Sequence, residues 1–158
     1  MNNFSTQAKV YILLTISAGL AFSLWQLLRL EELDFGLLAL AVLAAAAQLL
    51  KLEGPTEQSS YNISWLVYGF TLALLGVPAA VLVILAAHLV EWLRYRYPWY
   101  IQLFNIGSYA IAITVAGFVF QSFNPGDTLM TAAGAVAALL AVVVFTLINH
   151  LMIGLVLM

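Results

Sequence analysis

Two polar side chains in the most hydrophobic part of the chain have a spacing that could support chemistry. His88 and Glu91 are three residues apart, so a helix would place them on one face, with Arg94 and Tyr95 in the next turn. An imidazole beside a carboxylate could relay a proton, bind a polar ligand or anchor the helix to a neighbour. The simpler structural interpretation is a salt-bridged helix end near the membrane surface. Both interpretations stay open.

Three further polar residues lie inside predicted helices: Asn105, Asn149 and His150. Amides and imidazoles in lipid usually form hydrogen bonds between helices, although the same groups could bind a ligand. Together with the pair on the earlier helix, they form the candidate ligand pocket or proton relay. It comprises His88, Glu91, Asn105, Asn149 and His150.

Haem ligation by the two histidines is conceivable, but no second pair of histidines lies at matching depth. We therefore expect no cofactor and no metal. Gln48, Gln102 and Gln121 lie near predicted helix ends, where we expect them to face headgroups or loops.

The composition predicts an integral membrane protein. Of 158 residues, 65% are hydrophobic and 8% are charged, which leaves too little polar surface for a soluble globule. The few basic residues form no surface for nucleic acid, and the absence of cysteine excludes disulfides and thiolate chemistry. No catalytic motif is present, so we expect no enzyme activity within these residues.

Hydrophobic segments and short polar loops predict an all-α fold, an integral membrane six-helix bundle that forms one transmembrane domain over residues 1–158. A bilayer core of about 30 Å needs about 20 apolar residues in a helix. The expected helices cover residues 8–28, 35–51, 60–76, 78–95, 99–121 and 128–158.

The count depends on the uncharged interval from Gln58 to Val90, which is too long for one crossing. Gly76-Val77-Pro78 lies near its middle, and proline disfavours helix in the residue before it. We expect two short helices joined by a Gly-Val-Pro turn, with Gly76 and Pro78 as a hinge. One tilted helix with a proline kink is the alternative.

The basic residues favour two crossings in this interval. Lys9, Lys51, Arg94 and Arg96 would then share one side, with Arg29 opposite. Because Lys and Arg collect in cytoplasmic loops, this arrangement predicts a multi-pass membrane protein with both termini in the cytoplasm. The lipid bilayer is its first expected partner.

One stretch resembles a known family. "LALLGVPAAVLVILAAHLVEWLRYRYPWYIQLFNIGSYAIAITVAGFVF", followed by "LINHLMIGLVLM", is similar to the MASE-like membrane input regions of bacterial signalling proteins. The matching features are the Gly/Pro turn, the acidic then basic helix end at Glu91 to Arg96, Phe104-Asn105 and Asn149. The resemblance implies a sensor bundle in the bacterial inner membrane, ahead of a cyclic-di-GMP phosphodiesterase (HD-GYP), diguanylate cyclase (GGDEF) or histidine kinase domain.

The apolar run from Leu129 to Met158 has no closing charge, which favours a last helix that continues into such an output domain. The leading hypothesis is thus a sensory input domain for a ligand or a membrane property. The alternatives are a small-molecule-binding transport subunit, similar to the S components of energy-coupling factor transporters, and an accessory subunit of a larger membrane complex. A homodimer and a small-molecule ligand are the other partners these hypotheses allow.

Overall fold

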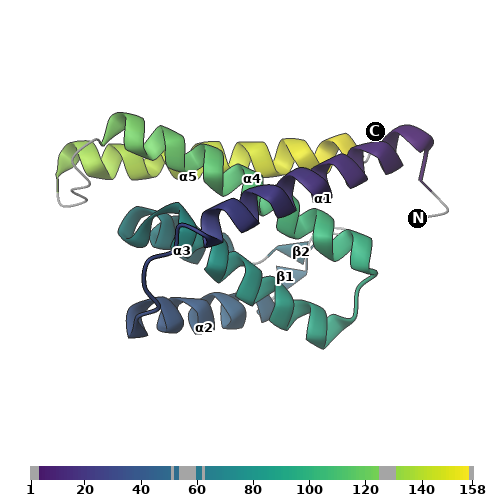
Figure 1. Ribbon diagram of the computed structural model, residues 1–158, viewed down its shortest axis with the longest axis horizontal. Coiled ribbons are helices and arrows are strands. Elements are labelled where there is room, and N and C mark those ends of the chain that lie inside the picture. The colour runs from purple at the N-terminus through teal and green to yellow at the C-terminus, as the bar shows by residue number, and fades with distance from the viewer. Residues whose placement is uncertain (1–3, 51, 54–59, 62, 125–130, 157–158) are drawn as a thin grey trace.

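The computed structural model describes residues 4–50, 52–53, 60–61, 63–124 and 131–156, which form five helices (Figure 1). They are α1 (Thr6–Leu27), α2 (Phe35–Leu49), α3 (Ser64–Tyr95), α4 (Trp99–Phe123) and α5 (Ala132–Val156). All except α2 are long and apolar enough to cross a membrane, and α2 is a shorter apolar helix. The chain is therefore a multi-pass membrane protein, and the all-α prediction is confirmed. Two strands of two residues each, β1 (Leu52–Glu53) and β2 (Ser60–Tyr61), pair antiparallel between α2 and α3.

The predicted count of six helices is not supported. The interval expected to hold two helices is one element, α3, and the three-residue turn at Gly76-Val77-Pro78 is absent. Only Gly76 leaves helical geometry, with φ 80° and ψ −178°, a region that residues with a Cβ avoid. Val77 and Pro78 are already helical. Proline fits there because its missing N–H costs nothing in the first turn after a break.

The break at Gly76 folds α3 back on itself. In a straight helix Tyr68 and His88 would lie about 30 Å apart. Their ring centroids are 6.5 Å apart, so the part of α3 before Gly76 lies beside the part after it. At this break Leu75 and Pro78 line a cavity together with the loop that contains Arg29 and Asp34.

Local hydrogen bonds define where the helices begin. The Ser5 hydroxyl accepts from the Ala8 amide at the start of α1, and Asp34 Oδ1 accepts from the Leu37 amide at the start of α2. Thr131 Oγ1 accepts from the Gly134 amide at the start of α5. The predicted beginning of this helix at residue 128 lies outside the described residues.

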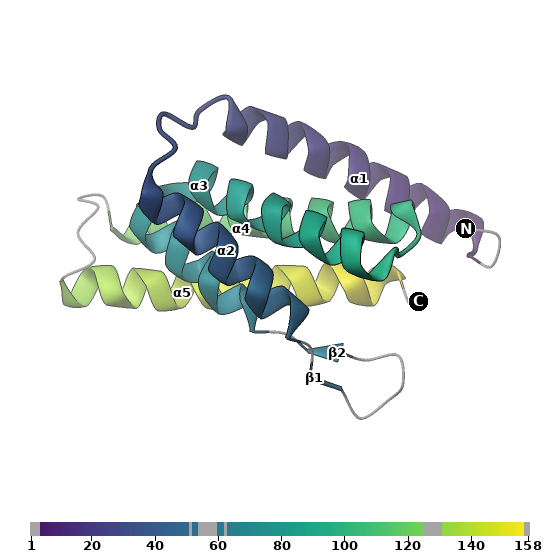
Figure 2. The same cartoon turned by 90° about the horizontal axis from the view of Figure 1, so that it is seen from below.

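The helices pack in two groups, which are joined by contacts between α3 and α4. α1, α4 and α5 form one group, and α2 packs against α3 in the other (Figures 1 and 2). α1 and α4 cross at Gly19 and Gly107, where a Cβ on Gly19 would lie 2.1 Å from the Gly107 Cα. Close approach through small residues is typical of helix contacts in lipid. The main core lies between α3, α4 and α5 and includes Ile84, Ile113 and Phe145.

The start of α1 and the end of α5 lie at the same end of the molecule in both views (Figures 1 and 2). Contacts agree, because Phe4, Tyr100 and Val156 line one cavity, and Tyr11 donates a hydrogen bond to the Met152 carbonyl. The end of α3 is adjacent to this end, since α4 begins only a few residues later.

Candidate functional site

His88 and Glu91 form a buried pair on the second part of α3. His88 Nδ1 lies 3.2 Å from Glu91 Oε2, and the two side chains are about 1% and 5% exposed. Their spacing of three residues on one helix brings them together, as the sequence predicts. A carboxylate in so apolar a setting requires partners, because an unpaired buried charge is costly.

Gln48, at the end of α2, supplies a partner that we did not expect. Its Nε2 donates to Glu91 Oε2 at 3.0 Å, and its Oε1 accepts from Tyr68 OH at 3.1 Å and from the Ser64 hydroxyl. One glutamine thus links α2 to both parts of α3. The expectation that Gln48 faces the headgroups is wrong, since its side chain is 2% exposed.

Gln102, in the first turn of α4, approaches the pair from the other side. Its Nε2 donates to the His88 carbonyl at 2.6 Å. It is also buried, so the headgroup expectation for this residue is wrong as well. Among the described residues, two buried polar atoms here find no hydrogen-bond partner, Gln102 Oε1 and His88 Nε2. We call Gln48, Ser64, Tyr68, His88, Glu91 and Gln102 the polar cluster.

A cavity of about 310 Å³ lies against the polar cluster, between α3 and α4. His88 and Gln102 contribute to its wall, and the remaining lining residues are apolar or aromatic: Leu85, Leu89, Trp92, Trp99, Leu103 and Ile106. Leu89 and Trp99 are about half exposed, so the cavity borders the outer surface of the bundle. Tryptophan is favoured where hydrocarbon meets the headgroups, which places this cavity near one membrane surface.

Aromatic rings connect the polar cluster to α5. The His88 ring lies 5.0 Å from the ring of Tyr109 on α4 and 6.5 Å from that of Tyr68. Both tyrosine rings contact Phe145 on α5, at 5.6 Å and 6.5 Å respectively. Phe145 and Tyr68 are fully buried. The rings of Tyr109 and Tyr68 therefore lie between His88 and α5 as one continuous layer.

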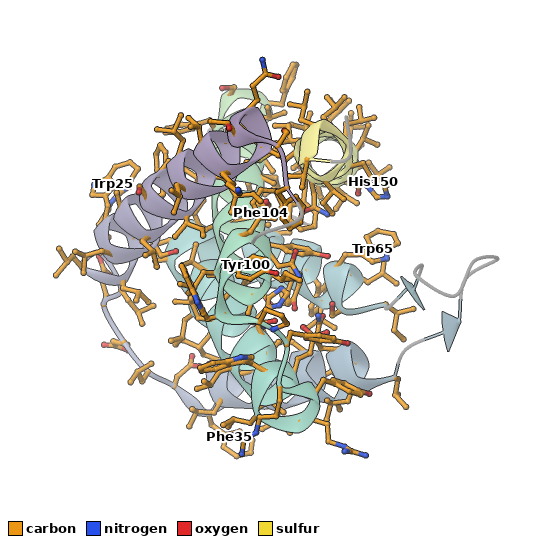
Figure 3. The ribbon with its side chains drawn as sticks, turned by 90° about the vertical axis from the view of Figure 1, so that its right-hand side faces the viewer. Trp25, Phe35, Trp65, Tyr100, Phe104 and His150 are labelled. Carbon is orange, nitrogen blue, oxygen red and sulfur yellow. The ribbon has the colours of Figure 1, made fainter. Side chains whose placement is uncertain are left out.

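The other three predicted site residues lie elsewhere. Asn105 lines a separate cavity of about 190 Å³ between α1, α4 and α5. Asn149 is buried on α5, where the part of the chain that the structure describes offers its Oδ1 no hydrogen-bond partner. His150 is exposed on the outer side of α5, where its Nδ1 lies 2.8 Å from the Thr146 carbonyl (Figure 3). The structure thus brings together His88 and Glu91 but leaves His150 outside the bundle.

Within the described residues, no three histidine, aspartate or glutamate side chains gather as a metal site. The arrangement is a buried hydrogen-bond network beside a cavity with an apolar surface. No family model, curated protein or solved structure matches this chain.

Proposed function

We propose that this chain is a sensory input domain of a membrane signalling protein, which transmits a signal from the polar cluster to α5. The observation that supports this proposal most is the ring contact from His88 through Tyr109 to Phe145. It provides a short physical connection between a buried polar site and the last helix. The resemblance to MASE-like input regions points to an output domain that acts in cyclic-di-GMP or kinase signalling.

The mechanism requires two packings of the bundle. A stimulus can move α5 only if it interacts more favourably with one packing than with the other. The polar cluster suits this role because its hydrogen bonds join α2, α3 and α4, so a change at His88 or Glu91 alters contacts of several helices at once. The Tyr109 and Tyr68 rings would then repack against Phe145 and displace α5.

The proposal includes an orientation. Lys9, Arg94 and Arg96 lie at the end of the molecule where α1 begins and α5 ends, and Arg29 lies at the opposite end. By the preference of basic residues for the cytoplasm, the first end is cytoplasmic. The chain would sit in a bacterial inner membrane, and α5 would leave the bilayer toward a cytoplasmic output domain.

The test starts with the reading frame that follows the codon for Met158. We expect it to encode a signalling domain. In the full-length protein, Phe145→Ala should shift the output activity several-fold, because it removes the ring that connects α5 to Tyr68 and Tyr109. His150→Ala is the matched control on α5, and its output activity should equal that of the wild type. A stop codon directly after Met158, or equal output activity in all three proteins, would overturn the proposal.

A further inference from the structure

The cavity between α3 and α4 offers an apolar surface to the membrane. Its wall exposes apolar atoms only, and its outer rim is formed by Leu89, Trp92 and Trp99, which are 51%, 38% and 52% exposed. The cavity is therefore recessed into the bundle and reachable from the lipid. An empty recess forfeits dispersion contacts, so hydrocarbon from outside the protein is the filling that this surface favours.

The position of the cavity restricts which part of a lipid can fill it. Trp92 lies in the last turn of α3 and Trp99 is the first residue of α4, and only Arg96, Tyr97 and Pro98 separate the two helices. The cavity therefore opens beside this short loop, at the level where tryptophan rings meet the headgroups. A hydrocarbon chain in the cavity has its headgroup at the loop.

Arg96 supplies a positive charge at this end of the cavity. Its amide donates to the Trp92 carbonyl at 2.9 Å, so its backbone completes the last turn of α3. Leu85, Leu89 and Trp92 line the cavity at the spacing of successive turns, and Arg96 follows them on the same face. The side chain is exposed, and a guanidinium is complementary to a phosphate group.

The backbone of Arg96 supports a role for its side chain. Its φ is 55° and its ψ is 38°, and no other described residue with a Cβ has a positive φ. Glycine is the usual residue at a helix end of this kind, because a Cβ is strained there. Stability alone would favour glycine at this position, so the arginine indicates a function of the guanidinium.

We propose that this cavity binds one acyl chain of an anionic phospholipid, whose phosphate group is held by Arg96 at the membrane surface. The chain lies against Leu85, Leu103 and Ile106, and the headgroup stays outside the cavity. A volume of about 310 Å³ holds part of one chain and excludes a complete phospholipid. The cation of a zwitterionic headgroup would compete with Arg96 for the phosphate, which favours an anionic lipid. The site is independent of the proposed sensory function.

The test measures lipid preference by fluorescence quenching. The protein with Trp25→Phe and Trp65→Phe is placed in phosphatidylcholine bilayers, so that Trp92 and Trp99 report the lipid at the cavity. A fixed fraction of the lipid is brominated phosphatidylglycerol in one sample and brominated phosphatidylcholine in the other. We expect the relative affinity to be about fivefold higher for phosphatidylglycerol, which corresponds to about 1 kcal/mol for one ion pair at a surface. Equal quenching by the two brominated lipids would overturn the proposal.

Variants locate the site. Arg96→Gly should remove most of the preference for phosphatidylglycerol without lowering the midpoint of thermal unfolding, because glycine accepts the left-handed backbone. Arg94→Gln is the matched control and should keep the preference. Arg94 has the same charge near the same membrane surface, but it lies about half a turn of α3 away from Trp92.

A third variant tests the cavity itself. Leu103→Phe, which narrows the cavity, should weaken the quenching by both brominated lipids. A preference that survives Arg96→Gly would contradict the role of this arginine. An equal loss of preference in Arg94→Gln and Arg96→Gly would show a general attraction of anionic lipid to this surface and would overturn the proposed site.

Discussion

At the scale of single residues, Gln48 explains how a glutamate is accommodated in an apolar bundle. Its amide donates to Glu91 and accepts from Tyr68 and Ser64, so both ends of the side chain are used. A buried hydrogen-bond network stabilises the fold when all its polar atoms have partners, whereas each polar atom left without a partner costs free energy. Within the polar cluster, His88 Nε2 and Gln102 Oε1 are the atoms for which the described residues supply no hydrogen-bond partner.

Replacing Gln48 tests this view. Gln48→Leu keeps the shape but removes the hydrogen bonds to Glu91, Tyr68 and Ser64, and we expect the free energy of unfolding to fall by about 2 kcal/mol. Unfolding in mixed micelles with increasing dodecyl sulfate measures it. Gln121→Leu is the matched control because Gln121 is exposed, and its stability should match the wild type. A loss of the same size in both variants would contradict the structural role of Gln48.

The sequence could predict only part of the site. His88 and Glu91 were predictable because spacing on one helix determines their proximity. Gln48 and Gln102 were missed because their contacts depend on how α2, α3 and α4 pack against one another. The sequence of an apolar helix does not indicate which of its faces meets which neighbouring helix. The same limit explains His150, whose sequence neighbourhood is as hydrophobic as that of His88 although it faces outward.

At the scale of elements, α3 depends on Gly76. A Cβ at this position would meet nothing closer than Pro78 Cδ at 3.9 Å. A side chain is therefore disfavoured by the backbone conformation and not by a steric clash. Its φ of 80° is unfavourable for other residues. The sequence indicated the interruption through Gly76 and Pro78, but it did not indicate that a single residue would suffice.

Substitution at Gly76 should therefore destabilise the bundle. We expect Gly76→Ala to lower the free energy of unfolding by about 1 to 3 kcal/mol. Gly154→Ala is the control, since nothing lies within 4 Å of a Cβ there and it should be neutral or slightly stabilising. The same titration with dodecyl sulfate measures both. Equal stability of the two variants would show that α3 does not need the positive φ.

The crossing of α1 and α4 provides a second prediction for an element. Gly19→Ala would place a Cβ 2.1 Å from the Gly107 Cα, so the two helices must separate. We expect a loss of about 2 kcal/mol, typical of overpacking, together with faster proteolysis of α1. If the stability of Gly19→Ala equals that of Gly154→Ala, the helices do not cross at these glycines.

At the scale of the whole molecule, the proposed orientation puts the beginning of α1 and the end of α5 at the cytoplasmic surface of the membrane. The chain contains no cysteine, so single cysteines can be introduced without background. With a maleimide that does not cross membranes, Arg96→Cys should react only in inside-out vesicles and Glu32→Cys only in right-side-out vesicles. Reaction of both variants from the same side would contradict the proposed orientation.

We propose that the polar cluster and α5 are mechanically connected. Spin labels on Leu66→Cys and Leu155→Cys, both exposed, would report the distance between α3 and α5 by pulsed electron resonance. Glu91→Gln replaces the carboxyl group that contacts Gln48 and His88, and we expect a shift of about 2 Å in that distance, typical of a helix displacement. With His150→Ala, the distance should match the wild type. Identical distance distributions in all three proteins would contradict the connection between the polar cluster and α5.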